Sequence, residues 1–437
     1  MTGFEIGVAM FAGVIALLVL RVPVAIAMLT AGGLGYVAIL GWGPLLNQLK
    51  TLTFSRYSSY TLSIIPLFLL MGELATRSGM SKRLYDAARA FLGHRKGGLA
   101  MATVGGCAAF GALCGSSIAT AATMSQVAGP EMRRQGYSGA LATGTLAGGG
   151  TLGILIPPSV ILVIYAIYTE QSIGALFVAA IVPGLLAVAM YMAVIAIYVR
   201  VAPASAPPSP RLPWADRIRA LRDVWPMVLV FVLVMGGIYG GWFSPTEAAG
   251  IGVVAMGAAA VVLGGLRLRD FGAALLGTAA TSAMIFLILL GAEVFSTALA
   301  LTRMPTVLSQ QIAGLDLAPL MIVALILLGY LILGCVMDAL AMVLLTLPIV
   351  FPVVLALDLG MSQVQAAVWF GILVLKAVEV GMISPPFGLN LFVINSMSRG
   401  VSMRETYVGV LGFCLADILR LVLIVLFPGV ALWLTGL

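Results

Sequence analysis

Oxygen-bearing side chains interrupt long apolar stretches of this sequence at six positions: Ser116, Ser117, Thr151, Asp338, Ser384 and Asn390. Hydroxyl, carboxyl and amide oxygens are hard ligands, which suit a cation such as sodium or a polar solute. Glycine or proline lies close to each position, and these residues break helices and free backbone carbonyls. The pattern predicts sodium ligands at Ser116, Ser117, Gly150, Thr151, Asp338 and Ser384. It predicts contacts to a bound solute at Ser116, Pro157, Pro158, Pro385, Pro386 and Asn390.

The residue types that most enzymes need are scarce in this chain. Its one histidine, His94, lies in a basic segment, and its four cysteines lie in apolar stretches without CxxC or Cys/His spacing. We expect these cysteines to be small buried side chains rather than metal ligands or disulfides. An intramembrane enzyme would need paired aspartates, or serine with histidine or lysine, within the membrane. No such set is evident, so we expect a protein that is not an enzyme.

The composition is that of a membrane protein. Of 437 residues, 62% are hydrophobic and 9% are charged, whereas soluble domains carry about 25% charged residues. Apolar runs of about 20 residues recur along the chain, which is the length that crosses a bilayer as a helix. The net charge of +7 comes from residues spread over the loops, which indicates membrane topology rather than nucleic-acid binding. We therefore predict an all-α polytopic membrane protein, surrounded by lipid.

Positive residues mark cytoplasmic loops. The strongest clusters lie within 77–96 and 200–222, with smaller ones at 133–134, 267–269 and 399–404. When all of these are placed inside, both chain termini fall in the periplasm.

Two segments do not fit simple crossings. Residues 99–130 lie between basic clusters that should share a side, but two full crossings need about 40 residues. A break at Gly115-Ser116-Ser117 favours a re-entrant helical hairpin. The alternative is one long tilted helix, which would place Arg133 and Arg134 outside. Residues 317–357 repeat the pattern, with a break at Gly334-Cys335-Val336-Met337-Asp338 and with Asp316 and Asp358 as flanks.

The two halves of the chain have the same order of elements with opposite flanking charge, which predicts inverted repeats. The first repeat, 1–200, contains scaffold helices at 1–76, a basic arm helix at 78–96, the hairpin at 99–130 and a broken helix at 137–168. A cytoplasmic linker follows at 201–223. The second repeat, 224–437, contains scaffold helices at 224–266, a long helix at 271–302, the hairpin at 317–357, a broken helix at 362–397 and a final helix at 405–435. Inverted repeats with broken helices are typical of secondary transporters.

Three motifs of the first half, 111–123 (GALCGSSIATAAT), 130–137 (PEMRRQGY) and 149–159 (GGTLGILIPPS), and one of the second, 379–392 (EVGMISPPFGLNLF), carry a family resemblance. With them the chain closely resembles the large permease subunit of tripartite ATP-independent periplasmic (TRAP) transporters, over nearly its whole length. The resemblance implies a sodium-coupled importer of a small organic acid, such as a C4-dicarboxylate or sialic acid, delivered by a periplasmic binding protein. It also implies a separate small four-helix membrane subunit and an elevator movement of the hairpin-bearing domain. A TRAP transporter subunit is expected in the bacterial inner membrane.

Some alternatives remain open at this point. A stand-alone carboxylate or ion symporter, driven by sodium or protons, would share hairpins and inverted repeats but would need no binding protein. Lys376 and Glu379 are either a pair that neutralises itself on one helix or a support of the second site. Asp417 and Arg420 form a similar pair, which is expected to be structural.

Overall fold

The computed structural model describes residues 2–313, 317–335 and 337–437. Asp316, expected to flank the second hairpin, and Val336, expected within its break, lie outside these residues. Helices make up 81% of the structure, and its described part contains no strand. The prediction of an all-helical chain is confirmed.

The first half comprises a series of helices that ends with one long helix. They are α1 (Gly3–Val19), α2 (Val24–Leu40), α3 (Trp42–Tyr57), the short η1 (Tyr60–Ser63), α4 (Ile64–Arg77), α5 (Met80–Leu92), α6 (Gly98–Cys114), α7 (Ser117–Arg134), α8 (Gly139–Leu155), α9 (Val160–Thr169) and α10 (Ile173–Val201). The linker holds η2 (Pro203–Ser205) and the short basic helix α11 (Trp214–Arg222).

The second half also consists of a series of helices. Its helices are α12 (Trp225–Tyr239), α13 (Pro245–Val262), α14 (Leu268–Leu301), α15 (Met304–Ala313), α16 (Pro319–Gly334), α17 (Ala339–Leu355), α18 (Gln363–Ile383), α19 (Leu389–Met397), α20 (Met403–Leu426) and α21 (Gly429–Leu432). The final helix is shorter than the predicted range 405–435, because α20 ends before Pro428, which cannot continue its hydrogen bonding.

Helix length and apolar character agree with a chain that crosses a membrane several times. Among the described residues, five helices could cross alone, and up to eight spans result if each bent pair counts as one. The pair α8 and α9 is one of these, bent by 40° at Pro157-Pro158. Both Pro-Pro peptide bonds, at 157–158 and at 385–386, are cis. In contrast, α6, α16 and α17 are shorter apolar helices.

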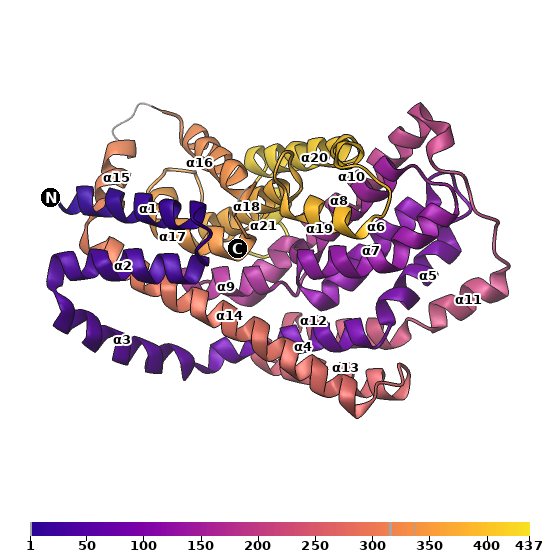
Figure 1. Cartoon of the computed structure of the whole chain (residues 1–437), viewed down its shortest axis with the longest axis horizontal. Coiled ribbons are helices and arrows are strands. Elements are labelled where there is room, and N and C mark those ends of the chain that lie inside the picture. The colour runs from indigo at the N-terminus through magenta and orange to yellow at the C-terminus, as the bar shows by residue number, and fades with distance from the viewer. Residues whose placement is uncertain (1, 314–316, 336) are drawn as a thin grey trace.

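The helix pair α6 and α7 folds back on itself, so that its two flanks lie together. The linker contacts both flanks: the Ser209 amide donates to the Gly93 carbonyl (3.0 Å) before α6, and the Ser138 amide after α7 donates to the Ser205 carbonyl (2.9 Å). The flanks of α16 and α17 also meet, since Pro319 and Asp358 line one surface cavity. Figure 1 shows α5 and α11 at one end of the molecule and α15 at the other.

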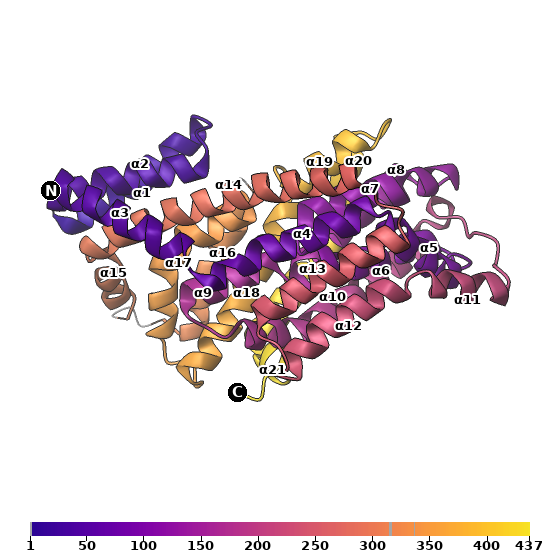
Figure 2. The ribbon, with the colours of Figure 1, turned by 90° about the horizontal axis from the view of Figure 1, so that it is seen from below.

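The core is formed by helices of both halves. Every residue of α18 from Ala366 to Ile383 is buried, and α8 packs against α6, α7 and α20. The long helix α14 lies along α2 and α4 on the outside of this core, as Figure 2 shows from below. Small residues allow the close approach of α8 and α20, because a Cβ at Gly409 would overlap the Ala140 backbone. These contacts place the breaks of both halves inside the molecule.

Candidate cation and substrate site

The tips of the two helix pairs meet at one cavity. Its volume is about 160 Å³, and it is lined by Gly115, Ser116 and Ser117 from the first tip and by Asp338 from the second. Helices α9 and α14 supply apolar walls, together with the hydroxyl-bearing Thr281. Asp338 alone carries a charge among the described lining residues. Two breaks that are far apart in sequence therefore form one small, mostly apolar chamber with a few oxygen atoms.

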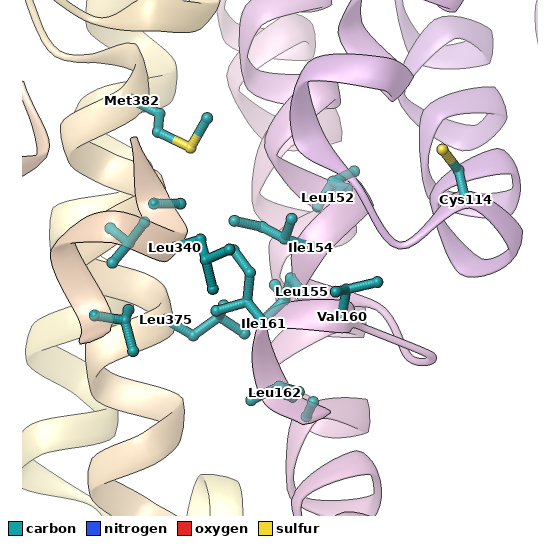
Figure 3. Packing of buried hydrophobic residues seen from close by; sticks show 14 of the residues in the cluster. Cys114, Leu152, Ile154, Leu155, Val160, Ile161, Leu162, Leu340, Leu375 and Met382 are labelled. Atoms are coloured by element: carbon teal, nitrogen blue, oxygen red, sulfur yellow. The ribbon is translucent and has the colours of Figure 1, made fainter. Parts of the chain in front are cut away.

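The surrounding walls also come from both halves of the chain. Figure 3 shows Ile154 and Ile161 of the first half packed near Leu340 and Met382 of the second, and these four residues line the same cavity. Apolar walls lower the local dielectric constant, which strengthens electrostatic interactions beside them.

The first tip is built by a glycine and a helix cap. Gly115 ends α6 with φ +64°, a left-handed conformation that favours glycine. A Cβ at Gly115 would also come 2.9 Å from the carbonyl oxygen of Pro158. Ser116 then caps α7, because its Oγ accepts a hydrogen bond of 3.4 Å from the Ala119 amide. The N-terminus of α7 therefore borders the cavity.

The second tip has the same design with a carboxylate as the cap. The Oδ2 atom of Asp338, which is half-buried, accepts a hydrogen bond of 3.1 Å from the Leu340 amide at the start of α17. Since Ala339 and Leu340 line the cavity, the N-terminus of α17 borders it as well. Two positive helix ends thus meet at one chamber. No hydrogen bond among the described residues joins Asp338 to Ser384 or Asn390.

Asn390 connects the second half to the first tip. Its Nδ2 donates to Ser117 Oγ at 2.6 Å, and both side chains are buried. The Oδ1 atom of Asn390 has no partner among the described residues. The structure therefore places Asn390 behind the tip, where it fixes the Ser117 hydroxyl.

One polar residue at the first tip was not singled out from the sequence. Thr120 is fully buried, and its hydroxyl makes no hydrogen bond to a described residue. Its Oγ1 and the carbonyl oxygen of Ser116 both lie against Gly153 of α8. The available signal was its spacing, because Thr120 lies one helical turn after Ser116 on the same face of α7.

The remaining predicted ligands lie around the breaks rather than on the cavity. Gly150 packs against Ala121 of α7, whereas the Thr151 hydroxyl points to α10 and lies 3.1 Å from the Tyr191 hydroxyl. The Ser384 hydroxyl donates to the carbonyl of Val380 at 2.7 Å. Pro157 and Pro158 are buried, Pro385 is half-buried and Pro386 is exposed.

Two ion pairs that are separate in sequence form one buried cluster. Lys376 pairs with Glu379 on α18, and Arg420 pairs with Asp417 on α20. Arg420 Nη2 also lies 3.8 Å from Glu379 Oε2, which joins the pairs. All four side chains are fully buried, and their formal charges cancel. The sequence predicted each ion pair, but it did not predict that the two pairs lie together.

A comparison with known families decides what kind of protein carries this site. Residues 11–430 match the model of the family described as "Tripartite ATP-independent periplasmic transporter, DctM component". The chain belongs to this family. It is therefore a TRAP transporter large permease, a multi-pass membrane transporter and not an enzyme.

Individual relatives agree over almost the whole chain. The C4-dicarboxylate TRAP transporter large permease protein of Pseudomonas aeruginosa is 36% identical over 400 residues, which cover 91% of this chain and 92% of that protein. The ectoine TRAP transporter large permease protein of Halomonas elongata is 31% identical and covers 98% of each chain. TRAP large permeases work with a small membrane subunit and a periplasmic binding protein.

A solved structure shows the same fold in a more distant protein. The YdaH transporter of Alcanivorax borkumensis, whose crystal structure is described as having an unusual topology, superposes with a TM-score of 0.60. The match covers 94% of this chain and 98% of that one at 16% sequence identity. At this sequence identity, the similarity shows only that the TRAP permease and the YdaH transporter share a fold.

Proposed function

We propose that this TRAP permease imports a small organic acid together with sodium ions, and that the binding site is the chamber between the two tips. The observation that carries the proposal is the meeting of Ser116, Ser117 and Asp338 at one cavity. Two helix N-termini favour a carboxylate there. The negative charge of Asp338 repels a bound carboxylate. An anionic solute in this largely apolar chamber therefore requires a compensating cation. Sodium, with oxygen ligands, supplies that charge.

The cation ligands are drawn from the oxygens at the two breaks. At the first tip, the Thr120 hydroxyl and the Ser116 carbonyl both lie against Gly153 of α8, and this hydroxyl has no hydrogen-bond partner among the residues that the structure describes. At the second, Asp338 offers a carboxylate that receives one hydrogen bond from its own helix. Carbonyls freed at the breaks complete such sites in broken-helix transporters.

The substrate is proposed as a small organic acid: a C4-dicarboxylate, sialic acid or a related carboxylate. Relatives named for a C4-dicarboxylate and for ectoine support this class, since both names describe small carboxylate-bearing solutes. A periplasmic binding protein, selective for the solute, delivers it from outside.

We further propose that α6–α7 and α16–α17 are re-entrant hairpins related by inverted repeats, and that they move as an elevator against the scaffold. The short apolar helices and the paired flanks of each hairpin support this reading. At about 1.5 Å per residue, the 17 residues of α6 are about 25 Å long, less than the ~30 Å hydrocarbon core. The protein lies in the inner membrane with both termini in the periplasm.

The decisive experiment is uptake by reconstituted vesicles. The chain, its small subunit and a binding protein loaded with its acid should take up that acid only with an inward sodium gradient. A potassium gradient of equal size is the matched control. Full uptake without sodium would favour proton coupling, and full uptake without the binding protein would favour a stand-alone symporter.

A further inference from the structure

The buried ionic cluster lies beside the first break, and the proposed function gives it no role. We infer that Tyr191 is a positioning residue for the proposed cation ligands at the first tip. Through Thr151 it holds the turn of α8 that lies behind Ser116. Asp417 and Arg420 in turn hold Tyr191. This inference rests on the proposed function, because it concerns the site formed by that tip.

A chain of hydrogen bonds runs from the cluster to α8. The Tyr191 hydroxyl donates to Asp417 Oδ2 at 2.7 Å. An ionised carboxylate only accepts, so the hydrogen of Tyr191 points to Asp417 and its oxygen is free to accept. Thr151 Oγ1 lies 3.1 Å from that oxygen and 2.8 Å from the Gly148 carbonyl, so its single hydrogen lies between two acceptors. This shared contact links Thr151 to α10, although the shorter of its two distances is to Gly148 within α8.

Tyr191 is itself held from several sides. Its ring packs edge-to-face on Phe413 of α20, with centroids 5.3 Å apart. The Arg420 guanidinium lies 5.4 Å from the centre of the same ring and pairs with Asp417. Tyr191 is fully buried, so this arrangement is shielded from water. Charged hydrogen bonds and cation–π contacts are stronger in such a dry environment than in water. The α20 residues thus fix the position of the Tyr191 hydroxyl.

The opposite face of the same turn of α8 touches the first tip. A Cβ at Gly150 would come 2.7 Å from the Ala121 side chain, and one at Gly153 would come 2.6 Å from the Ser116 carbonyl oxygen. Thr120 Oγ1 lies against Gly153 as well. This part of α8 is therefore clamped between the tip and Tyr191. Loss of the Tyr191 contact removes one of the restraints that hold this turn of α8 against the oxygens of Ser116 and Thr120.

The test is sodium dependence in Tyr191→Phe, which keeps the ring contacts and removes the hydroxyl. We expect the sodium concentration for half-maximal uptake to rise about three- to tenfold, the size expected for one hydrogen bond. Thr151→Val, a change of similar shape, should raise it to a similar extent. In the double variant the two effects should not add, because both remove the same link.

The matched control is Tyr165→Phe. Tyr165 is also fully buried, and its hydroxyl donates to the Ala367 carbonyl at the same distance of 2.7 Å, but outside the cluster. This variant should lower thermal stability without changing the sodium requirement. Equal sodium requirements in Tyr191→Phe, Tyr165→Phe and the wild type would overturn the inference. So would failure of both Tyr191→Phe and Thr151→Val to accumulate while Tyr165→Phe does, since the link would then be structural. Thr120→Val tests the proposed function separately, because it removes the hydroxyl proposed as a cation ligand while it keeps the shape of the side chain. If this variant leaves the sodium requirement unchanged, the proposed site itself is wrong.

Discussion

At the scale of single residues, Asp338 combines two roles that are usually separate. Its carboxylate caps α17 and faces a cavity whose other described lining residues are uncharged. A charged side chain within the membrane costs roughly 2.5–3.5 kcal/mol on insertion scales unless it is compensated. The backbone amide at the start of α17 offsets part of this cost, and a bound cation would offset more.

Replacement of Asp338 separates charge from capping. Asp338→Asn keeps an oxygen that can cap α17, so we expect normal accumulation but a higher sodium concentration for half-maximal uptake. Asp338→Ala should raise that concentration further and should also destabilise the protein by about 1 kcal/mol, because the cap is lost. Uptake at varied sodium and thermal unfolding in detergent measure the two effects.

The control for capping alone is Ser172→Ala. Ser172 caps α10, where its Oγ accepts a hydrogen bond of 3.3 Å from the Ala175 amide at an exposed position. It should lose stability without any change in the sodium requirement. If both Asp338 variants kept wild-type sodium dependence, Asp338 would be a cap only.

At the scale of helices, α8 is the element that connects the first tip with the ionic cluster. It contacts α6 and α7 on one side and α20 on another, and its buried surface is rich in glycine. Small residues let backbones approach closely where no hydrophobic force drives membrane helices together. The close contact of α8 with α20 brings the first break next to the ionic cluster.

The α8–α20 contact predicts a strong effect of one methyl group. Gly409→Ala would place a Cβ onto the backbone of Ala140, and overpacking of this kind typically costs about 1–3 kcal/mol. We expect a lower unfolding temperature in detergent. Gly250→Ala on α13 is the control, since a Cβ there has no atom within 4 Å. It should be neutral or slightly stabilising, because alanine favours a helix. Equal effects at both sites would contradict the close contact.

At the scale of the whole molecule, the flanks of each helix pair share an end. The linker joins the loop that contains His94 to the start of α8, which follows Arg133. We therefore expect a charged, membrane-impermeant reagent to reach both loops from the same side of the membrane.

Labelling of single cysteines tests this arrangement. In a variant without the four native cysteines, cysteines at His94 and Arg133 should react with a membrane-impermeant maleimide only after the cytoplasmic side is opened. A cysteine at Asp358 should react from the periplasm in intact cells, and the sequence predicts the same for Asp316. Labelling of Arg133→Cys from outside alone would rule out the first re-entrant hairpin and, with it, the inverted repeat.

The sequence by itself determined the helical class, the positions of the breaks and the family. These features depend on local properties: apolar length, glycine and proline at the tips, and short contiguous motifs such as 149–159. They are visible without any knowledge of which helices touch, because helix formation and interruption are decided within a few residues.

Only the tertiary structure decided which polar groups meet. The pairing of Ser117 with Asn390, the joining of Glu379 to Arg420, and the direction of the Thr151 hydroxyl toward Tyr191 all link different helices. The sequence around Thr151 predicts a cation ligand, yet the Thr151 side chain faces the ionic cluster. The physical reason is that the rotation of each helix about its axis is set by packing against the others. That packing is a property of the assembled core, which no single segment of the sequence encodes.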